Sequence, residues 1–206
     1  MRRGTRCGLR RIAAVAAGMA LWLAGTGGLS AWPAFALGPG QVCVFIQPHG
    51  APLPLGGTAG HIGWGYLVGG TSTWVYGSTE NPDGATQIDA PGFNGAWSAN
   101  ESFARMLDDF RRQPHFPSTV KQPRPAHPYT GYKCRPTDTS AVGAANIAAS
   151  DNIAAGYTFV GNNCLDAAYR VLRAYGAPDL PSPSLHWYPN DWYTALGGLW
   201  HAASLL

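Results

Sequence analysis

The sequence holds few cysteines and lacks the close-spaced ligand pairs that usually build metal centres. Four of its 206 residues are cysteine, and neither a CxxC nor an HExxH motif occurs. Zinc sites usually draw ligands from such pairs, so we expect no metal ion and no cofactor. A metal site made from His61, Cys164 and another histidine would have no such pair. The chain also has no internal repeat and no long low-complexity segment.

Beyond residues 1–36, the chain has no excess of basic over acidic residues. Five of the 14 Lys and Arg lie within residues 1–36, whereas all 11 Asp and Glu lie beyond them. Nine basic residues then face 11 acidic ones, a net charge of −2. The charge balance therefore gives no support to a nucleic-acid partner.

Residues 1–36 have the pattern of a secretory signal peptide. An apolar run, IAAVAAGMALWLAG, precedes the A-x-A site Ala34-Phe35-Ala36, so we expect cleavage just before Leu37. A membrane anchor is the competing interpretation, but the run is short and interrupted by glycines. No cysteine follows at a lipid-attachment position, which favours a soluble secreted protein. The basic residues ahead of the run are Arg2, Arg3, Arg6, Arg10 and Arg11.

Three cysteines remain in residues 37–206, an odd number for an oxidising compartment. Cys43 lies in a strand-like run and Cys134 in a proline-rich segment that a covalent link would help to order. We therefore expect a Cys43–Cys134 disulfide and a free Cys164. The alternative is three free thiols packed as small core residues.

Hydrophobic periodicity predicts an α+β domain with a small antiparallel sheet over residues 37–206. We expect a strand at 41–48, and then two strands within 61–80 that are joined by a turn at Gly69-Gly70. Ser98 or Asn100 can cap a helix at 101–113, where apolar residues recur at helical spacing. Six prolines at 114–136 indicate an extended connection.

The residue pattern in the second half of the chain predicts more helix than strand. An alanine-rich helix is expected within 137–156, capped by Thr137, Asp138 or Thr139. A short strand at 157–161 leads into an amphipathic helix at 164–175, which Gly176 ends. A short helix follows the Asn190-Asp191 cap in a tail that is otherwise loop.

Cys164 stands where this last long helix is expected to begin. A thiol attacks as thiolate, and the first turn of a helix favours that form through its unpaired N–H groups and its dipole. The backbone amide of Cys164 or the side chain of Asn163 could then bind the oxyanion of an attacked carbonyl. The alternative is a cysteine that only fills space between strand and helix.

A catalytic cysteine needs a base, and His61 is the best-placed candidate. It opens a strand between small residues, in AGHIGWG, so its ring could face a cleft. His186, among aromatic residues, could be the partner or a packed residue. The hairpin places residues 78–80 opposite His61, where Glu80 or, alternatively, Ser78 could orient the imidazole.

The motifs GHIGWGY and NNC resemble those of the circularly permuted papain-like hydrolases, the NlpC-related group that includes the lecithin retinol acyltransferase type. His61 precedes Cys164, which is the permuted order, and the resemblance covers roughly residues 41–176. It implies a permuted papain-like fold with Cys164 as nucleophile and His61 as base. In the acyltransferase branch the third member is commonly a second histidine, and this chain has Tyr76, Ser78 or Glu80 in that region.

The resemblance implies a secreted cysteine hydrolase of the amidase or endopeptidase type. Its expected substrate is a peptide, such as the peptides of a cell wall, and the chain is expected to act as a monomer. A non-catalytic binding module on the same fold and a lipid acyltransferase or esterase are the alternatives.

Overall fold

The computed structural model describes residues 39–51, 53, 55–80, 95–112, 128–200 and 204–206. The expected signal segment, the first half of the proline-rich connection and the loop after Glu80 lie outside these residues. In the described part, an antiparallel sheet has the strand order β4-β3-β2-β1-β5-β6. The fold is therefore mixed α and β, as the periodicity predicts.

Three strands of the sheet were expected from the sequence and are confirmed. They are β1 (Gly40–Gln47), β2 (His61–Leu67) and β3 (Thr73–Glu80). The turn between β2 and β3 includes Gly70, whose φ of 73° favours glycine. β1 is buried on both faces, since Val42 and Val44 face one core and Cys43 and Phe45 the other.

Three further strands were not expected. β4 (Gly95–Ser102) occupies residues assigned to a loop and a helix cap, and β5 (Gly131–Thr137) occupies part of the proline-rich connection. β6 is the short segment Ser204–Leu205, paired with β5. β5 lies beside β1 with Cys134 directly opposite Cys43, and the expected disulfide joins these two residues. Pairing with β1 thus overrides the weak strand signal of this segment.

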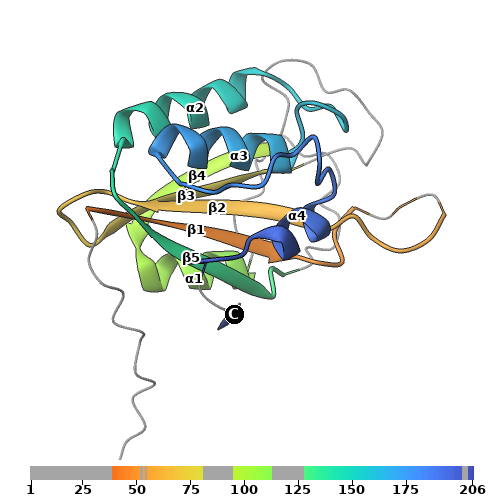
Figure 1. Cartoon of the computed structure of the whole chain (residues 1–206), viewed down its shortest axis with the longest axis horizontal. Helices are drawn as coiled ribbons and strands as arrows, with labels where there is room; N and C mark the ends of the chain where they lie inside the picture. Colours follow the sequence, from red (N-terminus) through yellow and green to blue (C-terminus); the bar gives the residue numbers. More distant parts are fainter. Residues whose placement is uncertain (1–38, 52, 54, 81–94, 113–127, 201–203) are drawn as a thin grey trace, which may run out of the picture. The chain divides into compact units, whose positions relative to one another are not determined.

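Helices cover both faces of the sheet (Figure 1). α2 (Val142–Ala154) and α3 (Cys164–Tyr175) lie side by side on one face, and α1 (Phe103–Arg112) lies on the other. The short α4 (Pro189–Ala195) adds Trp192 to the core beneath α2 and α3. Two apolar cores therefore flank the sheet, one on each face.

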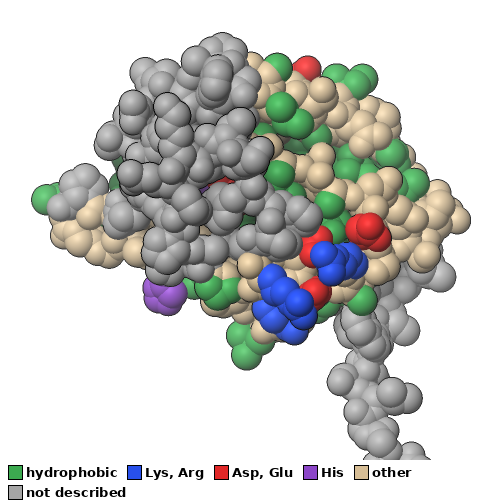
Figure 2. Space-filling view, turned by 180° about the vertical axis from the view of Figure 1, so that it is seen from behind, with side chains coloured by type: hydrophobic (Ala, Val, Ile, Leu, Met, Phe, Trp, Pro, Cys, Tyr) green, Lys and Arg blue, Asp and Glu red, His purple; other side chains and the backbone are tan. Residues whose placement is uncertain are grey.

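The outer side of α1 carries ion pairs between residues one turn apart. Arg105 and Arg112 both pair with Asp108, at 3.6 and 2.9 Å. Figure 2 shows basic and acidic side chains next to one another on this side of the molecule. The inner side of α1 packs Met106 and Phe110 against the sheet, so the helix is amphipathic as its sequence predicts.

Several expected element ends differ in the structure. α1 begins after Ser102, whose hydroxyl accepts from the Arg105 amide, and Ser98 and Asn100 lie in β4 instead. α2 has no side-chain cap, since its N-cap is Ala141 and the hydroxyl of Thr137 donates to the Thr139 carbonyl instead.

Two other expectations about the second half are also wrong. The segment 157–161 forms no strand, because Thr158 and Asn162 pair with each other across a tight turn. α4 begins at Pro189, ahead of the expected Asn190-Asp191 cap. Proline suits a first helical position because its φ is already helical and its missing N–H costs nothing there.

Candidate active site

Cys164 is the first residue of α3, and Asn163 fixes that start. The side-chain oxygen of Asn163 accepts from the amides of Leu165 and Asp166 at 2.8 and 3.1 Å. The carboxylate of Asp166 accepts in return from the Asn163 amide at 3.2 Å, which completes a capping box. The motif NNC therefore ends a turn and opens a helix, as predicted.

The first-turn amides of α3 donate to Asn163, with one exception. Those of Leu165 and Asp166 donate to the Asn163 side chain, and that of Ala167 donates to the Asn163 carbonyl at 3.0 Å. The Cys164 amide has no acceptor among the described residues. The side-chain amide of Asn163 donates to the Phe159 carbonyl at 2.8 Å. Of the two expected oxyanion donors, the Cys164 amide is thus the one without an acceptor in the described part of the chain, whereas one of the two N–H groups of the Asn163 side chain is engaged by Phe159.

His61 begins β2, at the end of the sheet where α3 begins (Figure 1). Gly60, the preceding residue, has a φ of 84°, and a Cβ there would collide with Asn190. Gly50 packs so closely on His61 that an added Cβ would lie 2.7 Å from the histidine Cβ. Small residues on both sides therefore set the position of the imidazole.

Glu80 and Ser78 lie beside the His61 ring. Gly63 pairs with Ser78 across the hairpin, and the same register sets His61 opposite Glu80. Nε2 of His61 is 2.7 Å from Oε2 of Glu80 and 3.1 Å from Oγ of Ser78. All three side chains are buried. The structure thus places both expected third members next to the imidazole, with the carboxylate closer.

Glu80 lies within hydrogen-bond distance of the His61 side chain, and Cys164 is near enough to interact with it electrostatically. Burial by itself lowers the pKa of His61, but the charges of Cys164 and Glu80 outweigh it and raise the pKa well above its usual range. Burial also disfavours the charged form of Glu80 and by itself raises the pKa of this carboxyl. The charge of His61 and the hydrogen bonds to the carboxylate outweigh burial and bring the pKa below its usual range. The arrangement therefore favours an imidazolium next to a carboxylate.

Tyr129 and Trp97 complete the surroundings of Glu80, and sequence reasoning missed both. The Tyr129 hydroxyl donates to Oγ of Ser78 at 2.9 Å and lies 3.4 Å from Oε1 of Glu80. Nε1 of Trp97 donates to the same carboxylate oxygen at 3.3 Å. Burial raises the pKa of Tyr129, so its hydroxyl keeps its proton. Trp97 lies opposite Ser78 in the pairing of β3 with β4, and only this pairing could have indicated that Trp97 is a neighbour of Glu80.

His186 does not take part in this cluster. Its Nδ1 lies 2.8 Å from the Asp191 carboxylate in an exposed pair five residues apart. The alternative of His186 as partner of Cys164 therefore has no support in the contacts. Over the described ranges, no group of three or more His, Cys, Asp or Glu side chains is arranged to hold a metal ion.

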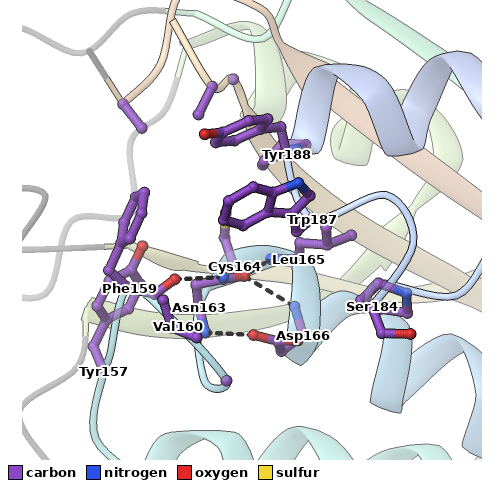
Figure 3. A pocket seen from close by; sticks show the side chains of 16 residues that line it. Tyr157, Phe159, Val160, Asn163, Cys164, Leu165, Asp166, Ser184, Trp187 and Tyr188 are labelled. Carbon is purple, nitrogen blue, oxygen red and sulfur yellow. Dashed lines mark hydrogen bonds between the residues drawn. The ribbon is translucent and has the colours of Figure 1, made fainter. Parts of the chain in front are cut away.

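Cys164 lines a pocket of about 370 Å³. Tyr157 and Phe159 stand on one side of it and Trp187 and Tyr188 on another, with Cys164 between them (Figure 3). Cys164 as a whole residue is 4% exposed. Of the candidate triad, Cys164 lines this pocket, whereas His61 and Glu80 are not among its described lining residues.

Comparisons with protein-family models, with curated proteins and with solved structures find no match to this chain. The contacts of the site therefore carry the functional argument. In the described part of the chain, no helix is long and apolar enough to span a membrane.

Proposed function

We propose that this protein is a cysteine-dependent acyl hydrolase of the amidase or endopeptidase type. One observation carries the proposal: the buried His61 ring contacts Glu80 through Nε2 and interacts electrostatically with Cys164, which lines a pocket. Nε2 faces Glu80, so Nδ1 is the ring nitrogen left for the sulfur. A nucleophile, a base and an orienting acid in this sequence of contacts form the catalytic triad geometry.

In the first half of the reaction, the proton of Sγ of Cys164 passes to Nδ1 of His61, which gives the imidazolium that the site favours beside Glu80. The thiolate attacks the substrate carbonyl, and the Cys164 amide donates to the oxyanion. The tetrahedral intermediate collapses when the imidazolium gives its proton to the leaving nitrogen. The products of this half are a free amine and a thioester on Cys164.

In the second half, water attacks the thioester carbonyl while His61 takes its proton. The second tetrahedral intermediate expels the sulfur, which recovers the proton from His61, and the carboxylic acid leaves. Glu80 stabilises the imidazolium in both halves and holds the ring in one orientation. Asn163 shapes the turn that presents the sulfur.

The permuted papain-like architecture is part of this proposal. Two features support it: His61 precedes Cys164 in the chain, and the helix that begins at Cys164 packs against the sheet in which His61 begins β2. We further propose that the chain is secreted, since a Cys43–Cys134 disulfide suits an oxidising compartment. A peptide, of a cell wall or another source, is the expected substrate, and a monomer the expected form.

The reactivity of Cys164 toward iodoacetamide tests the enzyme against a binding module of the same fold. We expect alkylation at pH 6 that is faster than that of glutathione, because His61 supports the thiolate. His61→Gln should slow it markedly, and Cys164→Ala should abolish it. A rate equal to that of glutathione, unchanged in His61→Gln, would refute the enzyme and leave the binding module.

A further inference from the structure

The pocket at Cys164 has an apolar wall of aromatic and aliphatic side chains. Asp166 is the one charged residue among the described residues that line it, and its carboxylate is engaged by the Asn163 amide. No lysine, arginine or histidine is among them. The aromatic and branched aliphatic side chains in the lining are Tyr157, Phe159, Val160, Leu165, Trp187 and Tyr188.

Two of these apolar side chains are left in solvent. Trp187 is 60% exposed and Val160 is 74% exposed, although both line the pocket. The Trp187 ring stacks on that of Tyr188 with centroids 4.8 Å apart, and both stand beside Cys164 in Figure 3. Apolar side chains grouped in solvent around a hollow are typical of a binding surface.

We propose that this pocket binds an uncharged, apolar acyl group, the part of the substrate that stays on Cys164 as the thioester. This inference rests on the proposed function. At about 30 Å³ for each water-sized group, the pocket holds roughly twelve non-hydrogen atoms. That is the size of an N-acylated aromatic residue or of a medium-length aliphatic chain.

The same walls disfavour an acyl group that carries a carboxylate. Such a group would lose its hydration against apolar side chains, and no cation of the described lining could compensate. The negative charge of Asp166 would also repel it. An apolar residue of a peptide and a fatty acyl chain share the favoured chemistry, and the experiment separates these two sources.

The experiment measures acylation of Cys164 by four p-nitrophenyl esters with one leaving group. The acyl groups are N-acetylphenylalanyl, octanoyl, N-acetylglutamyl and acetyl. We expect the phenylalanyl or octanoyl ester to react at least about tenfold faster than the acetyl and glutamyl esters. The faster of the two identifies a peptide or a fatty acyl source. Mass spectrometry of the intact protein and of Cys164→Ala shows whether the acyl group lies on Cys164.

Two variants test whether the pocket wall produces the preference. Trp187→Ala should reduce the preference for the apolar esters severalfold. Val160→Ser should act in the same direction, and its exposed position makes loss of folding no explanation. Ile147→Ala is the matched control, because this side chain is 65% exposed on α2 and lies outside the pocket.

The outcomes separate the two proposals. If no ester acylates Cys164, the proposed function fails and this inference with it. If Cys164 is acylated at similar rates by all four esters, the hydrolase stands and the apolar pocket is refuted. Loss of the preference in Ile147→Ala as well as in Trp187→Ala would also refute it.

Discussion

Glu80 and Ser78 both contact Nε2 of His61, and these contacts fix the orientation of the ring. Nε2 is 2.7 Å from Glu80, a carboxylate that also accepts from Trp97. In the proposed reaction the other nitrogen, Nδ1, exchanges the proton with Cys164. A ring held by a carboxylate loses little freedom on reaching the transition state, which is how an orienting carboxylate contributes to catalysis.

Glu80→Gln should lower the pKa of His61. The change keeps the size of the side chain and removes the charge that helps raise this pKa. An opposite charge at this distance favours the imidazolium, so its removal should bring a fall in the pKa of His61. NMR titration of the His61 ring carbons, assigned by their absence in His61→Gln, measures it.

Glu101→Gln provides the control for this titration. Glu101 is an exposed carboxylate on the neighbouring strand β4, so its loss removes the same charge without touching the ring. We expect the pKa of His61 to be unchanged in this variant. A His61 titration that is the same in Glu80→Gln and in the unaltered protein would contradict the role given to Glu80.

At the scale of elements, α4 holds the loop that leads into β2. The Asn190 side chain donates to the carbonyls of Pro48 and Thr58 at 3.0 and 3.1 Å, and its amide donates to Ala59 at 2.9 Å. Residue 190 is part of α4, whereas the loop ends one residue before His61. One side chain thus links a C-terminal helix to the position of the candidate base.

Asn190→Ala should lower the stability of the fold and slow the alkylation of Cys164. Two carbonyls lose their donor, which we expect to cost about 1–3 kcal/mol of the free energy of unfolding. Because the loop then holds His61 less firmly, iodoacetamide should alkylate Cys164 more slowly. Urea denaturation and the alkylation rate measure the two effects. Asn100→Ala, at an exposed position of β4, is the control and should change neither quantity. An unaltered alkylation rate in Asn190→Ala would show that the loop does not control the reactivity of Cys164.

The elements that the sequence predicts well are those with a strong local signal. The hairpin of β2 and β3 has β-branched and aromatic arms and a glycine turn, and α3 has a capping residue, an apolar stripe and Gly176 at its end. Cys164, His61, Ser78 and Glu80 fall on these elements, so their grouping could be predicted from the sequence. β4 and β5 have weak patterns and become strands only by pairing with β3 and β1.

Long-range contacts account for the residues that the sequence did not reveal. Tyr129 reaches Ser78 across 51 positions, and Asn190 reaches Pro48 across 142. Nothing near Tyr129 or Asn190 in the sequence indicates such partners, because local patterns determine elements and not which elements meet. The Asn163 cap, in contrast, bonds within three residues and follows directly from NNCLD.

At the scale of the whole molecule, a covalent link and a buried ion pair lie at different places in one sheet. The Cys43–Cys134 disulfide joins the adjacent strands β1 and β5 and closes a separation of 91 residues. The pair of His61 and Glu80 joins β2 to β3. The disulfide does not titrate, so the pH dependence of stability that these two links produce comes from the ion pair.

The stability of the protein should be highest between about pH 4.5 and 6.5. The pKa of Glu80 is lowered from 4.5, so its contribution is complete above that pH and is lost as the pH falls through the lowered pKa. The pKa of His61 is raised from 6.5, so its contribution is complete below that pH and is lost as the pH rises through the raised pKa. Urea denaturation from pH 3 to 9 measures this window. His61→Gln combined with Glu80→Gln should flatten the profile, and His186→Asn, which breaks an exposed pair, should retain it. A profile that keeps its maximum in the double variant would assign the pH dependence to other groups.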